Sequence, residues 1–348
     1  MKNNLYTKKV EHCGFVKTLL MFSVILLHSF MFWTGHWFET IPVAEECAPI
    51  AYIAKWIQTF SIYGFTLVSG YLYMFKYSSY RTKGIMIFLT GKIKRLIIPS
   101  FFVSTVWIIP ILYYFNSIDV KTAIKNYYLA ISPSQLWFLW MLFFVFVIIW
   151  PVSNIMISNR YWGWFIAFIS YLVAIVGRKF IPNYFNIWTA FSYVPFFYIG
   201  MCLRQKEDNN ETIISEKIPY YIWIIVDILL FIIYTFIKKT GFGGEHFTNS
   251  VKLILNMWGA VMAWLTFQTL GHKVNWRSCK PFIRLSESSM PIYLFHQQII
   301  YFVISTLNGR VNPIVNGLIN FLVSLLGAFL ISTLLMKWKI TRFLIGEK

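Results

Sequence analysis

Charged residues are scarce in this chain, and acidic ones especially so. Asp and Glu together number 13, against 31 Lys and Arg, and charged residues make up 13% of the 348 positions. A soluble domain is usually about one quarter charged. The four cysteines (Cys13, Cys47, Cys202 and Cys279) do not form CxxC or Cys/His metal spacings. We therefore expect neither a soluble fold nor a disulfide framework, and no metal site.

The motifs of common soluble enzymes are also missing. The chain has no Walker phosphate loop, GxSxG elbow, HExxH pair or GxGxxG turn. No histidine is followed five residues later by Asp, so the signature of soluble glycerolipid acyltransferases is absent. The first apolar segment is too long for a signal peptide and lacks a small-residue cleavage site, so no removable leader is expected.

Long apolar segments are what the sequence does contain. The chain is 58% hydrophobic and 20% aromatic, with a mean hydropathy of +0.61. Hydropathy divides it into ten expected spans. They lie at residues 15–34, 50–75, 97–115, 136–157, 162–177, 187–203, 218–237, 251–270, 289–306 and 314–336. The sequence thus predicts an all-α polytopic membrane helix bundle of about ten transmembrane helices, forming a single domain over residues 1–348.

The distribution of positive charge predicts the orientation of these spans. With the N-terminus inside, the inner segments hold 21 of the 31 Lys and Arg, and the outer loops hold seven. Short cytoplasmic loops of membrane proteins carry such an excess, so both termini are expected in the cytoplasm. The net charge of +18 is then a topology signal. Membrane lipids, and no nucleic acid, are the expected partners of these cations.

The first span, Phe15–Trp33, carries two polar nitrogenous side chains, Lys17 and His28. Eleven residues at ~100° each make three turns plus about 20°, so both lie on one helix face, roughly 16 Å apart along the axis. Lys17 can snorkel to the interface. His28 lies too deep for that, and a neutral imidazole there is a candidate general base. The simpler interpretation is a histidine that hydrogen-bonds across two helices.

A second candidate lies at the inner membrane edge, where Lys92 and Arg95 share a helix face. Such a pair can hold phosphates, and Arg offers bidentate geometry. An ordinary positive-inside anchor or an anionic-lipid contact is the alternative. The residues before Pro99 are typical of an amphipathic or re-entrant helix, and Pro99 itself marks a kink or a helix start.

Five further positions are candidates with weaker signals. Ser69 and Gly70 close the second span, where glycine usually indicates close helix packing. Trp137 is either an interfacial-belt residue or a ligand-stacking platform. His296 is a second intramembrane imidazole that can face the same cavity as His28. Asp227, in the middle of the seventh span, either orients a histidine or bonds to a neighbouring helix.

Several of these motifs, taken in order, resemble acyltransferase family three, the bacterial membrane O-acyltransferases. The resemblance rests on the spacing of Lys17 and His28, the sequence FTLVSGYL at the end of the second span, and Lys92-x-x-Arg95 before a proline. It also rests on LWFL opening the fourth span and IYLFH on the ninth. The chain departs from the family where Lys17 and Lys92 replace the usual arginines and Gly14 replaces an acidic residue.

The resemblance implies transfer of an acyl group, usually acetyl, in the bacterial cytoplasmic membrane. The donor would be cytoplasmic acyl-CoA (acetyl-CoA) as substrate, with no bound cofactor, and its phosphates would rest on Lys17, Lys92 and Arg95. The acceptor would be a hydroxyl of a surface glycan or its lipid-linked precursor. His28 would act as base or carry the acyl group itself. Alternatives are the separate membrane-bound O-acyltransferase superfamily and a polysaccharide flippase or polymerase without acyl transfer.

Overall fold

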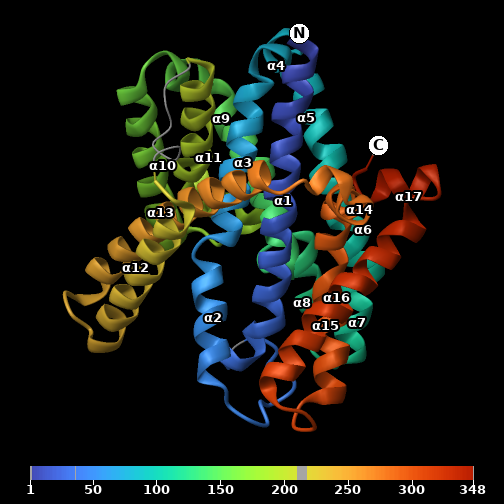
Figure 1. The fold of residues 1–348 in the computed structure, drawn as a ribbon. Helices are drawn as coiled ribbons and strands as arrows, with labels where there is room; N and C mark the ends of the chain where they lie inside the picture. The colour runs from blue at the N-terminus through green and yellow to red at the C-terminus, as the bar shows by residue number, and fades with distance from the viewer. Residues whose placement is uncertain (1, 36, 210–217, 348) are drawn as a thin grey trace.

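The computed structural model describes residues 2–35, 37–209 and 218–347, and every regular element within these ranges is helical (Figure 1). The α-helices are α1 (Lys2–Met31), α2 (Ala48–Gln58), α3 (Ser61–Phe75), α4 (Tyr77–Lys83), α5 (Ile85–Lys92), α6 (Ile98–Val103), α7 (Ile109–Tyr114), α8 (Val120–Ala123), α9 (Trp137–Ser158), α10 (Arg160–Phe180), α11 (Ile187–Asp208), α12 (Tyr220–Thr240), α13 (Gly244–Lys273), α14 (Lys280–Glu287), α15 (Ser289–Leu307), α16 (Pro313–Leu335) and α17 (Lys339–Leu344).

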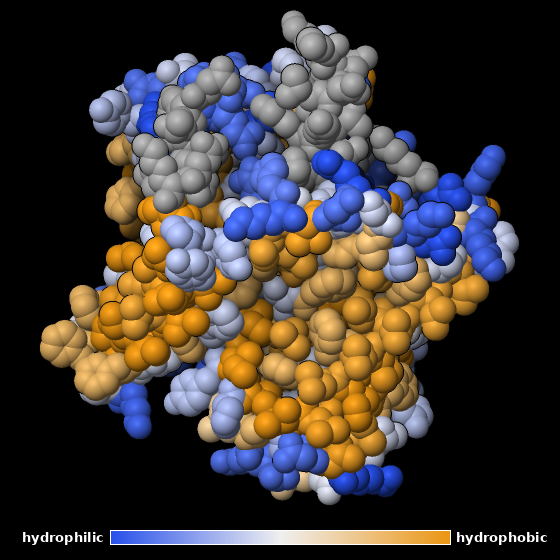
Figure 2. All heavy atoms as spheres, viewed as in Figure 1, coloured by the Kyte–Doolittle hydropathy of each residue, from blue (hydrophilic) through white to orange (hydrophobic). Residues whose placement is uncertain are grey.

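The protein is a multi-pass membrane protein, as the sequence predicts. In the described part of the chain, seven helical segments are long and apolar enough to cross a bilayer. They are Cys13–Thr34, Ile85–Tyr114, Ser134–Ser158, Arg160–Phe180, Tyr220–Thr240, Gly244–Lys273 and Pro313–Leu335. The other three expected spans coincide with α2 plus α3, with α11 and with α15, so the count of about ten stays a prediction. Figure 2 shows a broad apolar region between hydrophilic zones on the visible face.

The expected second span is interrupted in its middle. Helix α2 ends at Gln58 and α3 begins at Ser61. The Thr59 hydroxyl donates to the Trp56 carbonyl at 2.6 Å, and the Phe60 amide donates to the Ile57 carbonyl three residues earlier. These short-range bonds satisfy carbonyls that a continuing helix would have used. The break leaves Gln58 and Thr59 lining a cavity between the helices.

The segment Ile85–Tyr114 is one long helix with two wider π-helical turns, η2 (Ile93–Ile97) and η3 (Ser104–Ile108). Each turn comes directly before a helix that carries proline at its second residue, Pro99 or Pro110. Proline has no amide hydrogen and clashes with the preceding turn, and a π turn relieves both problems. The predicted amphipathic stretch thus continues into the membrane span as one uninterrupted helix.

Helices α3 and α11 cross with their backbones in direct contact. A Cβ built on Gly70 would lie 1.9 Å from the Phe197 carbonyl oxygen, and one built on Gly200 would lie 1.9 Å from the Leu67 carbonyl oxygen. Only glycine fits at either position. Small residues allow membrane helices to approach this closely, which is the packing role that the sequence offered for Gly70.

Candidate active site

Two histidines from distant parts of the sequence meet in the core of the bundle. His28 Nδ1 on α1 lies 2.6 Å from His296 Nε2 on α15. The ring planes differ by only 11°, with centroids 4.9 Å apart, so the imidazoles are nearly coplanar and face each other edge to edge. His296 has no solvent exposure. The structure thus brings together the two intramembrane histidines that the sequence singled out.

The second ring nitrogen of His296 determines how protons are placed in this pair. His296 Nδ1 lies 2.8 Å from the Tyr293 carbonyl oxygen, which only accepts hydrogen bonds. His296 must therefore carry its proton on Nδ1, and when neutral it accepts at Nε2. His28 then donates from Nδ1 and keeps an unprotonated Nε2. This tautomer leaves His28 Nε2 as the nitrogen able to accept a proton or attack a carbonyl.

Buried amide side chains hold α15 in register at this point. Gln135 and Gln298 exchange two hydrogen bonds, of 2.8 and 3.1 Å, and the Gln135 amide also donates to the Leu294 carbonyl at 2.9 Å. The Tyr293 hydroxyl donates to the Gln135 carbonyl. Sequence reasoning missed these three supporting residues. The polar pair Gln297-Gln298 beside His296 in an apolar span was a signal for Gln298 alone.

The loop that follows α1 also packs against His28. The Trp37 indole is roughly parallel to the His28 ring, with centroids 5.8 Å apart and planes 20° apart. Trp37 in turn packs against Tyr301 on α15, at 5.1 Å between centroids. An aromatic ring beside an imidazole limits its rotation and excludes water from that side.

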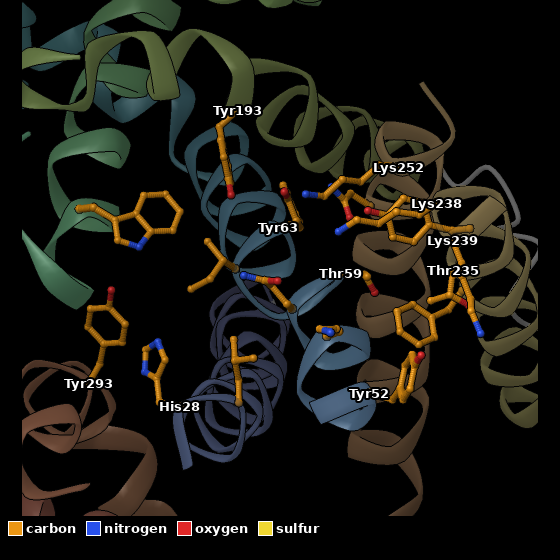
Figure 3. Close-up of a pocket in the computed structure, with 18 residues that line it drawn as sticks. His28, Tyr52, Thr59, Tyr63, Tyr193, Thr235, Lys238, Lys239, Lys252 and Tyr293 are labelled. Carbon is orange, nitrogen blue, oxygen red and sulfur yellow. The ribbon is translucent and has the colours of Figure 1, made fainter. Parts of the chain in front are cut away.

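A cavity of about 500 Å³ opens beside His28. Figure 3 shows His28 and Tyr293 at one end and Lys238, Lys239 and Lys252 at the other. The other lining residues come from α1, α2, α3, α9, α11, α12 and α13, and they are Leu27, Tyr52, Lys55, Gln58, Thr59, Ile62, Tyr63, Trp137, Tyr193, Phe231, Tyr234, Thr235 and Asn256.

The remaining predicted cavity residues are placed unequally. Trp137 lines this cavity. Ser69 and Gly70 are not among its lining residues, because Gly70 is pressed against α11 and the Ser69 hydroxyl donates to the Phe65 carbonyl at 2.9 Å within its own helix. Their predicted role in lining a cavity therefore stays a prediction, and close helix packing is the role observed for Gly70.

The cations predicted to bind the donor gather at one end of the bundle, the end that the charge distribution predicts to be cytoplasmic. Arg95 is exposed, and its charge repels those of Lys17 and Lys92. The Glu347 carboxylate lies near enough to attract both Arg95 and Lys17. Burial raises the pKa of Glu347 above its usual value, and these two cations oppose that rise. Lys17 and Arg95 therefore share one site that already contains an anionic group of the protein itself.

Lys92 has a different environment from Arg95. Its ammonium lies 3.6 Å above the centroid of the Phe146 ring and within 5.4 Å of the rings of Phe88 and Tyr80. Such contacts hold a cation by attraction to aromatic faces. Arg95 is thus better placed than Lys92 to offer its charge to a soluble phosphate.

Asp227 has a structural partner away from the histidines. The Trp56 indole donates to Asp227 Oδ2 at 2.8 Å and so ties α2 to α12. The second carboxylate oxygen, Oδ1, has no hydrogen-bond partner in the described structure. Of the two roles that the sequence left open for Asp227, the bond to a neighbouring helix is the one observed.

The sequence matches the profile of an acyltransferase domain over residues 14–337, which is nearly the whole chain. The chain belongs to acyltransferase family 3. It is therefore a membrane acyltransferase. No curated protein and no solved structure matched in the corresponding comparisons.

The range that matches acyltransferase family 3 includes both residues of the histidine pair and all residues that line the cavity. The matched range contains His28, Arg95 and His296, and it ends ten residues before Glu347. The Glu347 carboxylate, which attracts Lys17 and Arg95, therefore lies outside the range that the family profile matches.

Proposed function

We propose that this acyltransferase moves an acetyl group from cytoplasmic acetyl-CoA to a hydroxyl of a surface glycan or of its lipid-linked precursor. The observation that carries the proposal is the hydrogen-bonded pair of His28 and His296 at the end of a cavity, in a member of an acyltransferase family. A bacterial cytoplasmic membrane, with both termini inside, is the proposed location.

In the proposed reaction His28 Nε2 removes the proton from the acceptor hydroxyl. The hydroxyl oxygen attacks the thioester carbonyl, the carbon–sulfur bond breaks, and the thiolate of coenzyme A takes the proton back from the imidazolium. His28 Nδ1 donates to His296 throughout, so the ring keeps its orientation. The same nitrogen, Nε2, would attack the thioester if His28 carried the acyl group first.

The donor would approach from the inner side. Arg95 and Lys17 supply positive charge for its phosphates, and His28 lies ~16 Å farther along α1 than Lys17. A long flexible arm between phosphates and thioester is what this separation requires, and coenzyme A has one. The donor phosphates would compete with the Glu347 carboxylate for the attraction of Arg95 and Lys17.

Replacing His28 tests the proposal. We expect His28→Ala to lower acyl transfer from acetyl-CoA to the glycan by at least 100-fold, because general-base catalysis contributes about 10²–10⁴-fold. The measurement is transfer of radiolabelled acetyl by the purified full-length protein in lipid nanodiscs. His246→Ala is the matched control, because His246 is exposed on α13 and does not line the cavity.

Wild-type transfer by a correctly inserted His28→Ala protein would contradict the catalytic role of His28. Absence of transfer in the wild type as well, together with glycan movement across the membrane, would instead support a flippase without acyl-transfer activity.

A further inference from the structure

The cavity that begins at His28 ends in a cluster of lysines. Lys238 and Lys239 lie in the last turn of α12, Lys252 lies on α13 and Lys55 lies in the last turn of α2. All four line the cavity and all four are exposed. We call them the lysine mouth. Figure 3 places three of them, Lys238, Lys239 and Lys252, at the end of the cavity opposite the candidate catalytic site.

The lysine mouth has no negative charge of its own to balance it. Within the described ranges, ion pairs form at Arg204 and at none of these four lysines. Lys238 and Lys252 repel each other, since each lies in the field of the other. Holding like charges together costs free energy unless an anion binds between them. The cluster therefore has the electrostatics of an anion site.

The walls between the lysine mouth and His28 suit a saccharide. They carry the aromatic rings of Tyr52, Tyr63, Tyr193, Tyr234 and Phe231, which offer apolar faces and hydroxyl groups. Asn256 also lines the cavity, is only 5% exposed, and its Oδ1 has no hydrogen-bond partner in the described structure. A buried amide oxygen without a donor is costly, and a sugar hydroxyl would satisfy it.

We infer that the cavity selects an anionic glycan: the lysine mouth binds a carboxylate or phosphate group of the acceptor while a hydroxyl of the same molecule reaches His28. This assignment rests on the proposed acyl transfer and adds the chemical class of the acceptor. The break between α2 and α3 contributes to it, because Lys55, Gln58 and Thr59 of that break all line the cavity.

Binding without any donor tests the site independently of catalysis. The full-length protein, in nanodiscs of phosphatidylcholine alone, is titrated with hexagalacturonate and with its carboxyl-reduced, neutral counterpart. Quenching of tryptophan fluorescence reports binding, because Trp137 lines the cavity. We expect the acidic hexamer to bind about tenfold more tightly, and the difference to shrink as salt rises.

A pair of matched double variants tests which lysines are responsible. K238Q/K252Q removes two charges from the lysine mouth, whereas K121Q/K125Q removes two exposed charges from an outer loop that does not line the cavity. We expect K238Q/K252Q to abolish the preference for the acidic hexamer, and K121Q/K125Q to retain it. Equal affinity of the wild type for both hexamers would overturn the inference. So would the same preference for the acidic hexamer in both double variants.

Lipid headgroups are a second source of anionic phosphate for these lysines, and nanodiscs that contain phosphatidylglycerol test them. If K238Q/K252Q changes only the association with this lipid and leaves glycan binding unchanged, the lysines contact lipid headgroups and the inference is wrong. Loss of hexagalacturonate binding in this variant, with the lipid present or absent, supports the glycan site.

The acceptor itself is tested by measuring acetyl transfer to the acidic and neutral fractions of the host's surface glycan. We expect transfer to the acidic fraction, with K238Q/K252Q raising KM about tenfold and leaving kcat unchanged. Transfer only to the neutral fraction would overturn the acceptor class but leave the acyltransferase function standing. Tight binding of the acidic hexamer without any acetyl transfer would support the anion site but contradict the proposed acetyl transfer.

Discussion

His28 has an unusual partner for a candidate base. Hydrolytic triads orient the base with a carboxylate, which also stabilises the imidazolium that forms. Here the orienting group is the neutral imidazole of His296, which is itself held by a backbone carbonyl. A neutral partner stabilises the imidazolium less, but it places no permanent charge among apolar helices, where a charge is costly. The pair therefore suits a base that is charged only during turnover.

Arg95 carries the sharpest test of the donor site. Hydrogen bonds to charged groups contribute about 1.5–3 kcal/mol, so Arg95→Ala should raise the KM for acetyl-CoA by roughly 10- to 100-fold. Its neighbour Lys94 is also exposed but, as the adjacent residue, faces another side of the helix, so Lys94→Ala is the matched control. Steady-state kinetics in nanodiscs provide the measurement. Unchanged donor KM in Arg95→Ala would identify Arg95 as a lipid anchor.

The sequence identified single residues only where their type is costly in an apolar span and therefore rare there. His28 and His296 were identifiable because imidazoles are rare within apolar spans. Gln135 and Gln298 were not, since their amide pair joins positions 163 residues apart and depends on how the segment Ser134–Ser158 packs against α15. The lysine mouth was missed for the same reason: its members lie on three helices whose arrangement no local pattern specifies.

At the scale of elements, the crossing of α3 and α11 is the most constrained contact. In Gly200→Ala the added methyl group would meet backbone atoms of α3, so the helices must separate. Overpacking typically costs about 1–3 kcal/mol, and we expect a clearly lower melting temperature in detergent. Gly91→Ala on α5 is the control, because its methyl group would meet nothing within 4 Å. Equal melting temperatures in the two variants would contradict this packing.

Hydropathy located the helices better than it located their ends. It predicted one span at 50–75, whereas the structure has two separate helices there, α2 and α3. Hydropathy is averaged over a window of residues, so it cannot detect the hydrogen bond from the Thr59 hydroxyl to the Trp56 carbonyl at the end of α2. At Pro99 the sequence predicted a kink or a helix start. The structure has a π turn directly before the helix that carries Pro99, an adjustment by which membrane helices often accommodate proline.

For the molecule as a whole, the sequence predicted the class of fold and its orientation in the membrane. The all-helical, multi-pass architecture is confirmed. Orientation follows from the charge bias alone, and both proposed sites depend on it: Arg95 must face the cytoplasm to meet acetyl-CoA, and the lysine mouth must face outward to meet a surface glycan. Figure 1 places the start of α1 and helix α17 in the upper half of the view, consistent with a shared side.

The two ends of α13 allow this orientation to be tested in whole cells. Glu245, in its first turn, is exposed and expected outside, whereas Cys279 comes shortly after its end, is exposed and is expected inside. In a chain without its other cysteines, an impermeant maleimide should label Glu245→Cys in intact cells. It should label Cys279 only after permeabilisation, and a reporter at the C-terminus should be cytoplasmic. Labelling of Cys279 in intact cells would reverse the orientation, placing the lysine mouth on the donor side and excluding a surface glycan as its ligand.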